Sequence, residues 1–154
     1  PIVKTLDVTI KILGPNSAPI LELPGTLNYN NSTGIYSNTI PTEKVIKTGF
    51  YNIYVKAPSY LVKRIDMNLI EGSENNLSQV VLSGGDINED GSRNLLDWNL
   101  IHACSDSIGH DEETCSKNEK YARNSDMNKD RKTELENDIQ LWLREYRNYK
   151  NPSN

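Results

Sequence analysis

Residues 86–97 read Asp-Ile-Asn-Glu-Asp-Gly-Ser-Arg-Asn-Leu-Leu-Asp, with oxygen-bearing side chains at fixed intervals. Those side chains occupy loop positions one, three, five, nine and twelve, and they belong to Asp86, Asn88, Asp90, Asn94 and Asp97. Ser92, at position seven, can add its backbone carbonyl, and Gly91, at position six, suits a sharp turn with positive φ. Ca²⁺ takes roughly six to eight oxygen ligands. The spacing therefore predicts a calcium loop rather than a turn that is merely rich in Asp and Asn.

The residues on either side of this first loop predict a helix after it and a strand before it. Residues 95–104 contain good helix formers and an apolar stripe of Leu96, Leu100 and Ala103. Residues 77–82 read as a strand. A helix therefore leaves the loop and none enters it, which is half of an EF-hand.

A second loop begins at Asp126, again with oxygens at positions one, three and five, but Arg131 stands where the turn glycine is expected. Strict counting closes this loop at Asn137, whereas aligning the two exit helices closes it at Asp138 and implies one inserted residue. The predicted ligands are Asp126, Asn128, Asp130, Glu134 and Asp138, with the backbone carbonyl of Lys132. A second calcium site and a loop that keeps the fold without holding metal well both remain open.

The two loops and their exit helices resemble the dockerin module, whose Asp-x-Asn-x-Asp-Gly-x-x-Asn-x-x-Asp calcium loop (an F-hand) occurs twice in tandem. The resemblance covers residues 85–146 and departs from the family at Arg93, where an apolar residue usually links the two loops. It implies a small all-α calcium-binding module that docks onto a cohesin module of another protein. The partner face in that family includes loop positions ten and eleven, which here are Leu95, Leu96, Leu135 and Glu136. Cellulosome dockerins typically carry a small hydroxyl pair there, and the leucines could equally be covered by the N-terminal domain.

The N-terminal half predicts short strands. Residues 6–12 alternate apolar and polar side chains, and residues 50–57 place Tyr51, Ile53 and Val55 on one face. Seven such strands, the last over residues 77–82, predict an antiparallel β-sandwich, transthyretin-like or immunoglobulin-like. Residues 49–60 resemble a strand of carboxypeptidase-regulatory, transthyretin-like domains, which implies a structural or adhesive role. The predicted fold class is thus α+β in two parts, with the sandwich over residues 1–83 and the dockerin-like module over residues 84–154.

Cys104 and Cys115 are the only cysteines of the chain. Two cysteines in a hydrophilic chain with extracellular-type calcium loops favour one disulfide over two free thiols. A zinc site is less well supported, because the spacing offers no set of four ligands.

Composition and motifs exclude several classes of function. The 154 residues carry a net charge of −4 with no basic cluster, which argues against nucleic acid as a partner. No apolar run approaches the length of a membrane span. Neither histidine, His102 or His110, lies within the sandwich, and the chain has no nucleophile elbow or phosphate-binding glycine loop, so we expect no enzyme. The chain begins without a signal peptide, and we expect it to be a piece of a longer protein.

Three functions remain after these exclusions. The first is an extracellular or cell-surface docking module that binds calcium and places its parent protein on a scaffold through a cohesin-type partner. The second is a structural or adhesive module in which calcium only rigidifies the fold. The third is carbohydrate binding by the sandwich, through the tyrosines Tyr29, Tyr36, Tyr54 and Tyr60.

Overall fold

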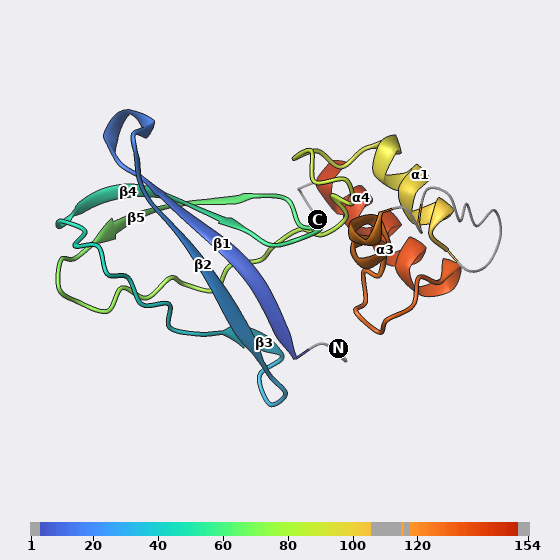
Figure 1. The fold of residues 1–154 in the computed structure, drawn as a ribbon, viewed down its shortest axis with the longest axis horizontal. Helices are drawn as coiled ribbons and strands as arrows, with labels where there is room; N and C mark the ends of the chain where they lie inside the picture. Colours follow the sequence, from blue (N-terminus) through green and yellow to red (C-terminus); the bar gives the residue numbers. More distant parts are fainter. Residues whose placement is uncertain (1–3, 106–114, 116–117, 151–154) are drawn as a thin grey trace. The chain divides into compact units, whose positions relative to one another are not determined.

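The computed structural model describes residues 4–105, 115 and 118–150. Within these residues the chain has one five-stranded antiparallel sheet and three α-helices, which is an α+β combination (Figure 1). The chain divides into two compact units. The sheet unit comprises Lys4–Ala57 and Val62–Leu82, and the helical unit comprises Pro58–Leu61 and the described residues from Ser83 onward. No described helix is long and apolar enough to cross a bilayer.

The sheet has the strand order β3-β2-β1-β4-β5, and every neighbouring pair is antiparallel. Its strands are β1 (Thr5–Leu13), β2 (Pro19–Asn30), β3 (Ile35–Ser37), β4 (Gly49–Lys56) and β5 (Lys63–Leu69), with a 3₁₀ turn (Pro15–Ser17) between β1 and β2. The central pairing of β1 with β4 places Ile12 opposite Ile53.

The core of the sheet unit lies on one face of the sheet. Its buried residues are Ile12, Ile53, Val55 and Leu69, and they come from β1, β4 and β5. Because side chains alternate along a strand, the residues between them face solvent or lie at intermediate depth. The apolar faces predicted for residues 6–12 and 51–55 are therefore confirmed.

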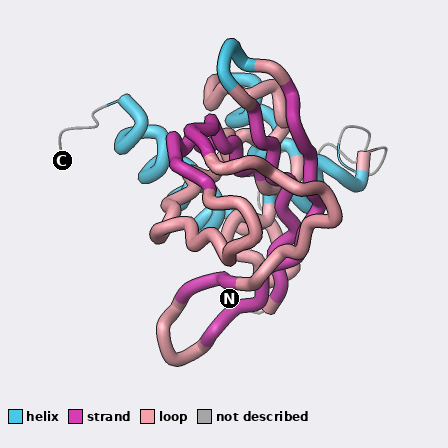
Figure 2. The backbone as a smooth tube through the Cα atoms, turned by 90° about the vertical axis from the view of Figure 1, so that its left-hand side faces the viewer, coloured by secondary structure: helices cyan, strands magenta, loops and turns pink. Residues whose placement is uncertain are grey.

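The second layer of the sheet unit is irregular chain, so the predicted two-sheet sandwich is not confirmed. Figure 2 draws the long connecting segments as loops beside the strands. Ile46, Leu77 and Leu82 from these segments pack against the core. The strand predicted over residues 77–82 is wrong: the chain there is irregular, and its two partly buried leucines, Leu77 and Leu82, lie five residues apart, so they do not follow the alternation of a strand. Asn75 also turns the chain just after β5, by bonding both the N–H and the carbonyl of Ile70 at 2.8 and 3.1 Å.

The helical unit contains α1 (Leu95–Ala103), α3 (Glu119–Ser125), a short π-helix η2 (Leu135–Ile139) and α4 (Gln140–Lys150). Its core is formed by Ile101, Ile139 and Trp142, with Trp98, Met127, Leu143 and Tyr146 packed around them. The sequence also predicts a short helix over residues 112–123, leading into the second loop, and part of that stretch lies outside the described residues. The sequence also predicts an exit helix over residues 135–149 that carries Leu141, Trp142 and Tyr146 into the core. That helix is confirmed as η2 and α4, but Leu143 rather than Leu141 joins the core.

A segment paired through its backbone leads into the first loop, in place of the strand predicted over residues 77–82. Residues 83–86 pair with residues 59–61 of the same unit through three backbone bonds of 2.8–3.0 Å, from Leu61 to Ser83 and from Gly85 and Asp86 to Ser59. No α-helix of the described chain enters this loop. By contrast, α3 ends at Ser125, directly before the second loop.

The apolar stripe predicted for the first exit helix is not its most buried face, because Leu100 and Ala103 lie at intermediate depth and Leu96 is exposed. In α1 the buried residues are Asp97 and Ile101, and Trp98 packs on the core beside them. Leu96 is 58% exposed. The reason is that the carboxylate of Asp97 must turn inward to serve the loop, and this orients the helix so that Leu96 faces outward.

Candidate metal centre

The first loop, residues 86–97, has a positive φ at Gly91, as its spacing predicts, and also at Glu89, which was not predicted. Glu89 and Gly91, at positions four and six, have φ values of 61° and 85°. Two short side-chain bonds shape the turn between them: Asn88 Oδ1 accepts from Asp90 N at 3.0 Å, and Asp90 Oδ1 accepts from Ser92 N at 2.8 Å. Gly91 N donates to Asp86 Oδ1 at 3.4 Å. These contacts bend the chain back toward Asp86 and gather the predicted ligands around one turn.

The closing residue of the loop, Asp97, fixes both ends of it. One carboxylate oxygen accepts from Ile87 N at 2.7 Å and from Asn88 N at 3.2 Å. The other oxygen accepts from Asn94 N at 2.8 Å and so completes a capping box at the start of α1. The side chain of Asp97 therefore ties the beginning of the loop to the first turn of its exit helix.

Two buried carboxylates give this loop its electrostatic character. Asp86 and Asp97 are both fully buried. Burial raises the pKa of Asp97, and the nearby charge of Asp86 raises it further, while backbone N–H groups of Asn94, Asn88 and Ile87 act in the opposite direction. A cation between such carboxylates would favour their ionised forms.

The second loop repeats the closing hydrogen bonds of the first one. Asp138 accepts from Met127 N at 2.8 Å and Asn128 N at 3.0 Å through one oxygen, and from Glu134 N at 2.8 Å through the other. It is fully buried, like Asp97. Burial likewise raises the pKa of Asp138. Asp138, not Asn137, is therefore the structural counterpart of Asp97.

The turn bonds of the second loop match those of the first as well. Asn128 Oδ1 accepts from Asp130 N at 2.8 Å, and Asp130 Oδ1 accepts from Lys132 N at 3.0 Å. Asp126 accepts from Arg131 N at 2.8 Å, the bond that corresponds to the one between Gly91 and Asp86. Two segments of different sequence thus have the same loop architecture.

The inserted residue of the second loop is absorbed as a π-helical turn. Residues Leu135–Ile139 form η2, directly before α4. A π-turn accommodates one extra residue while the chain on both sides keeps its direction. Asp138 can therefore reach the loop although it lies one residue further along than strict spacing allows.

Three basic residues distinguish the second loop from the first. Lys129 and Arg131 have φ values of 61° and 76°, at the positions of Glu89 and Gly91. A residue with a Cβ in this left-handed region costs about 1 kcal/mol or more, so Arg131 strains the turn where glycine would not. Lys132 follows directly. The charges of these residues oppose cation binding in the second loop.

The donor set of the first loop fits a hard cation. It offers carboxylate, amide and backbone carbonyl oxygens, the ligands that Ca²⁺ prefers. Three backbone bonds use only part of the acceptor capacity of Asp97, because a carboxylate has about four lone-pair directions. No group of three or more His, Cys, Asp or Glu side chains that could hold a metal exists among the described residues. The fit therefore depends on the amide and carbonyl donors as well as on the carboxylates.

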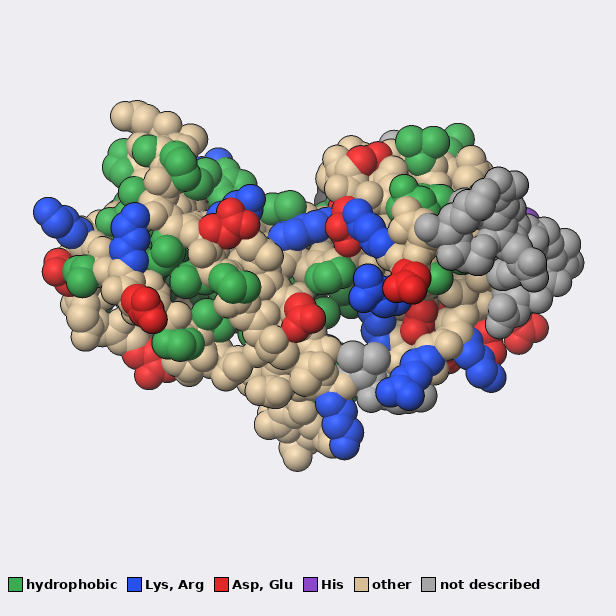
Figure 3. All heavy atoms as spheres, in the orientation of Figure 1, with side chains coloured by type: hydrophobic (Ala, Val, Ile, Leu, Met, Phe, Trp, Pro, Cys, Tyr) green, Lys and Arg blue, Asp and Glu red, His purple; other side chains and the backbone are tan. Residues whose placement is uncertain are grey.

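The residues predicted to meet a partner are placed differently in the two repeats. Leu95 and Leu96 lie at the start of α1 and are 73% and 58% exposed. Figure 3 shows hydrophobic side chains gathered on the surface over α1. Glu136 is exposed on η2. Leu135 belongs to the same turn, but its side chain lies outside the described residues.

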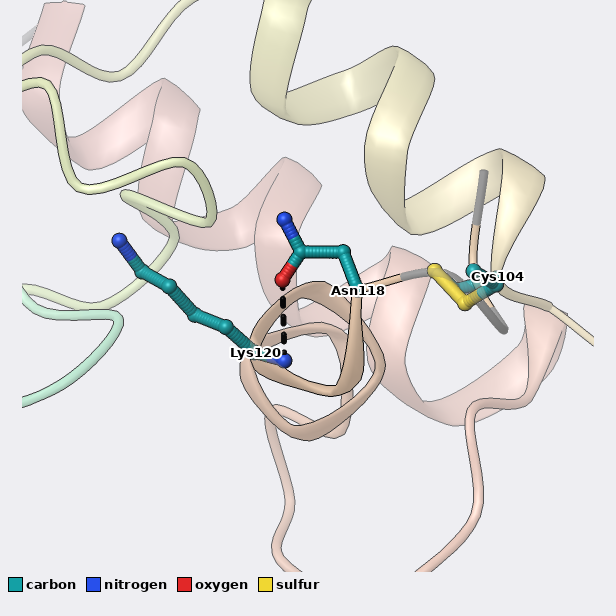
Figure 4. The surroundings of a disulfide bond; sticks show 4 residues. Cys104, Asn118 and Lys120 are labelled. Atoms are coloured by element: carbon teal, nitrogen blue, oxygen red, sulfur yellow. Dashed lines mark hydrogen bonds between the residues drawn. A yellow bond between two sulfur atoms is a disulfide. The ribbon is translucent and has the colours of Figure 1, made fainter. Parts of the chain in front are cut away.

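The disulfide between Cys104 and Cys115 is confirmed, and it joins the end of α1 to the chain before α3 (Figure 4). Of the two histidines, His102 lies on α1, and His110 lies outside the described residues.

Two supporting residues of the site, Arg93 and Asn124, were not identified from the sequence. Arg93, at position eight, is 3% exposed, and its guanidinium donates to the carbonyl of Glu145 in α4 and to Ser83 Oγ at 2.6 Å. Its place in the loop, where an apolar residue is usual, was the available signal that it is buried. Asn124 of α3, which donates to the carbonyl of Ile87 at 2.8 Å, carries no such signal.

Comparison with known proteins supports the fold and leaves the function open. The sequence matches no known protein family and no curated protein. Its fold is similar to a chain in the crystal structure of a type II cohesin–X-dockerin complex from Acetivibrio cellulolyticus, a C-terminal interface mutant. The TM-score is 0.56 and the identity 22%, and the match covers 94% of this chain and 83% of the other. At this identity the similarity concerns the fold.

Proposed function

We propose that this chain is an extracellular, non-enzymatic docking module of the dockerin type, which binds calcium and attaches its parent protein to a cohesin-type partner. The observation that carries the proposal is the role of Asp97. Its carboxylate closes the first loop and caps the same helical turn that exposes Leu95 and Leu96. A cation held by the loop would therefore also fix the orientation of the two leucines.

The first loop is the main calcium site in this proposal. Its ligands are the side chains of Asp86, Asn88, Asp90, Asn94 and Asp97 and the backbone carbonyl of Ser92. When bound, calcium neutralises carboxylates that the loop holds close together. The chain itself helps to position these ligands, because Asn88, Asp90 and Asp97 accept hydrogen bonds from backbone N–H groups of the loop.

The second loop is a weaker site. Asp126, Asn128, Asp130, Glu134 and Asp138 would provide its side-chain ligands, with the backbone carbonyl of Lys132. Its hydrogen bonds match those of the first loop, and this supports binding. The charges of Lys129, Arg131 and Lys132 and the strain at Arg131 lower its expected affinity.

The docking face is the exposed start of α1, with the start of η2 as its counterpart in the second repeat. Two adjacent leucines, 73% and 58% exposed, are costly in water unless a partner covers them. The counterpart carries Glu136 instead of a second leucine pair, so the two repeats cannot present the same surface. We therefore expect the first repeat to provide most of the affinity.

The double substitution Leu95→Ser/Leu96→Ser tests this function. It should reduce capture of a purified type II cohesin domain by at least tenfold in calcium, because the apolar anchor of the interface is lost. The melting temperature should change little, since both side chains are largely exposed. Surface plasmon resonance gives the affinity, and differential scanning calorimetry gives the stability.

A matched control is the double variant Val45→Ser/Val81→Ser, which removes two aliphatic side chains that are 71% and 75% exposed in the sheet unit. It should bind the cohesin domain as the unchanged protein does. Capture that survives in the leucine variant, or a large fall in its stability, would contradict the proposed docking face.

A structural role for calcium is the second candidate, and the buried Arg93 favours it. Its contacts with the Glu145 carbonyl and with Ser83 tie the first loop to α4 and to the segment before the loop. A loop that is anchored in this way would use calcium to stiffen the whole helical unit. Calcium-dependent stabilisation without capture of any cohesin-type domain would support this alternative.

A further inference from the structure

The helix α3 braces the first loop through a buried asparagine. Asn124 is 4% exposed, and its amide donates to the carbonyl of Ile87 at 2.8 Å and to Glu89 Oε1 at 3.1 Å. Ile87 lies between ligand positions one and three, and Glu89 between positions three and five. The side chain of Asn124 therefore holds the backbone on which Asp86, Asn88 and Asp90 are mounted.

A second residue of α3 contacts the same stretch of the loop. Lys120 Nζ lies 3.0 Å from Glu89 Oε2 and 3.4 Å from the carbonyl oxygen of Asn88. Figure 4 shows its side chain extending away from α3. Because Lys120 and Asn124 are four residues apart, they lie on one face of the helix. That face is the one that meets the loop.

The start of α3 is hydrogen-bonded to a cysteine of the disulfide. A helix of seven residues has little stability of its own. Its N-cap, Asn118, accepts from Lys120 N at 3.2 Å (Figure 4). The backbone N–H of Asn118 donates to the carbonyl of Cys115 at 3.3 Å. Cys115 is bonded to Cys104, the residue that ends α1.

These contacts form one connected series that starts at the first loop and returns to it. The loop leads into α1, α1 ends at the disulfide, the disulfide anchors the start of α3, and Asn124 of α3 returns to the loop. We propose that Asn124 is a positioning residue for the first calcium site, and that the Cys104–Cys115 disulfide holds it against the loop. This inference rests on the proposed calcium site, and it assigns the disulfide a role in metal affinity beyond stabilising the fold.

The physical reason is preorganisation. A loop whose backbone is already fixed loses less conformational entropy when the cation binds. Groups that orient metal ligands without touching the metal typically change affinity by about tenfold to a hundredfold when they are removed. The carbonyl of Ile87 would otherwise be free to turn away and to take the neighbouring ligands with it.

The variant Asn124→Ala tests the inference, with Asn99→Ala as the matched control, because Asn99 is exposed on α1. Calcium titrations by isothermal calorimetry should give a dissociation constant about tenfold weaker for Asn124→Ala. The control should match the unchanged protein. Equal constants for Asn124→Ala and for the unchanged protein would overturn the inference.

A measurement without calcium separates this inference from the calcium site itself. In the metal-free protein, hydrogen exchange at residues 87–91 should be faster in Asn124→Ala than in Asn99→Ala. If the unchanged chain binds no calcium, the proposed site fails, while this exchange comparison still decides whether Asn124 positions the loop. Unchanged exchange would contradict the positioning role.

The double variant Cys104→Ser/Cys115→Ser tests the part played by the disulfide. Calcium affinity should fall about as far as in Asn124→Ala. Combining all three substitutions should weaken it little further, since they remove the same series of contacts between the disulfide, α3 and the first loop. Full additivity, or an affinity equal to that of the unchanged chain, would show that the disulfide does not act through Asn124.

Discussion

Replacing Asp97 with alanine should destabilise the helical unit by about 3 kcal/mol even without calcium. Three backbone N–H groups, of Ile87, Asn88 and Asn94, lose their acceptor, and each orphaned donor costs roughly 1–3 kcal/mol when it is buried. Relief from burying the carboxylate, whose pKa is raised mainly by that burial, offsets part of this loss. Urea unfolding in a chelator, followed by circular dichroism, measures the change.

Asp90→Ala provides the comparison for Asp97→Ala. Asp90 is exposed, and its two turn bonds, from Ser92 N and from Asn88 Nδ2, are also exposed. Its removal should cost less than 1 kcal/mol or so in the chelator, and it should abolish most of the stabilisation that calcium adds. Equal losses for the two variants in the chelator would show that Asp97 does not have the structural role assigned to it.

The variant Trp142→Ala should cost about 3–5 kcal/mol, as expected for a buried tryptophan. Trp142 is 3% exposed and lies within 5.4 Å of the ring centroid of Trp98 and 5.0 Å of that of Tyr146. Its indole Nε1 donates to the carbonyl of Gly85 at 3.0 Å. The substitution therefore leaves a cavity and also frees the segment that enters the first loop.

Gly85 packs closely against the side chain of Trp142. Its φ is 98°, and a Cβ there would lie 2.9 Å from Cδ1 of Trp142. As a control for Trp142→Ala, Trp98→Ala should lose less stability, because Trp98 is only half-buried. Hydrogen exchange of residues 86–103, measured at increasing temperature, compares the stability of the two variants. A Trp142→Ala protein as stable as Trp98→Ala would contradict the assigned core.

The loop architecture could be predicted from sequence because few residues satisfy a tight turn. Oxygen side chains at positions one, three and five accept local N–H bonds, and left-handed conformations are needed at positions four and six. Even Arg131 adopts the conformation that glycine takes in the first loop. The insertion in the second loop was also visible, since the exit helices align only with one extra residue.

Tertiary contacts were much harder to predict. The stripe of Leu96, Leu100 and Ala103 looks like a core face by periodicity, yet the need to turn Asp97 inward decides which face of α1 is buried. In the sheet unit, the alternation of apolar and polar residues suggested seven strands, whereas loop residues such as Leu77 and Leu82 provide the second layer without strand pairing. Asn124 could not be found, because a single amide that reaches a loop more than thirty residues away in sequence leaves no local pattern.

Calcium titration of the intact chain by isothermal calorimetry tests whether the first loop binds calcium. We expect saturable heat from one main site with a dissociation constant of about 10⁻⁴ M or tighter, which is sufficient for an extracellular module. The same site should be lost in Asp90→Ala, and calcium at about a hundredfold above the dissociation constant should stabilise the helical unit by roughly 2.7 kcal/mol. An intact, folded chain that shows no calcium-dependent heat would contradict the proposed calcium site in the first loop.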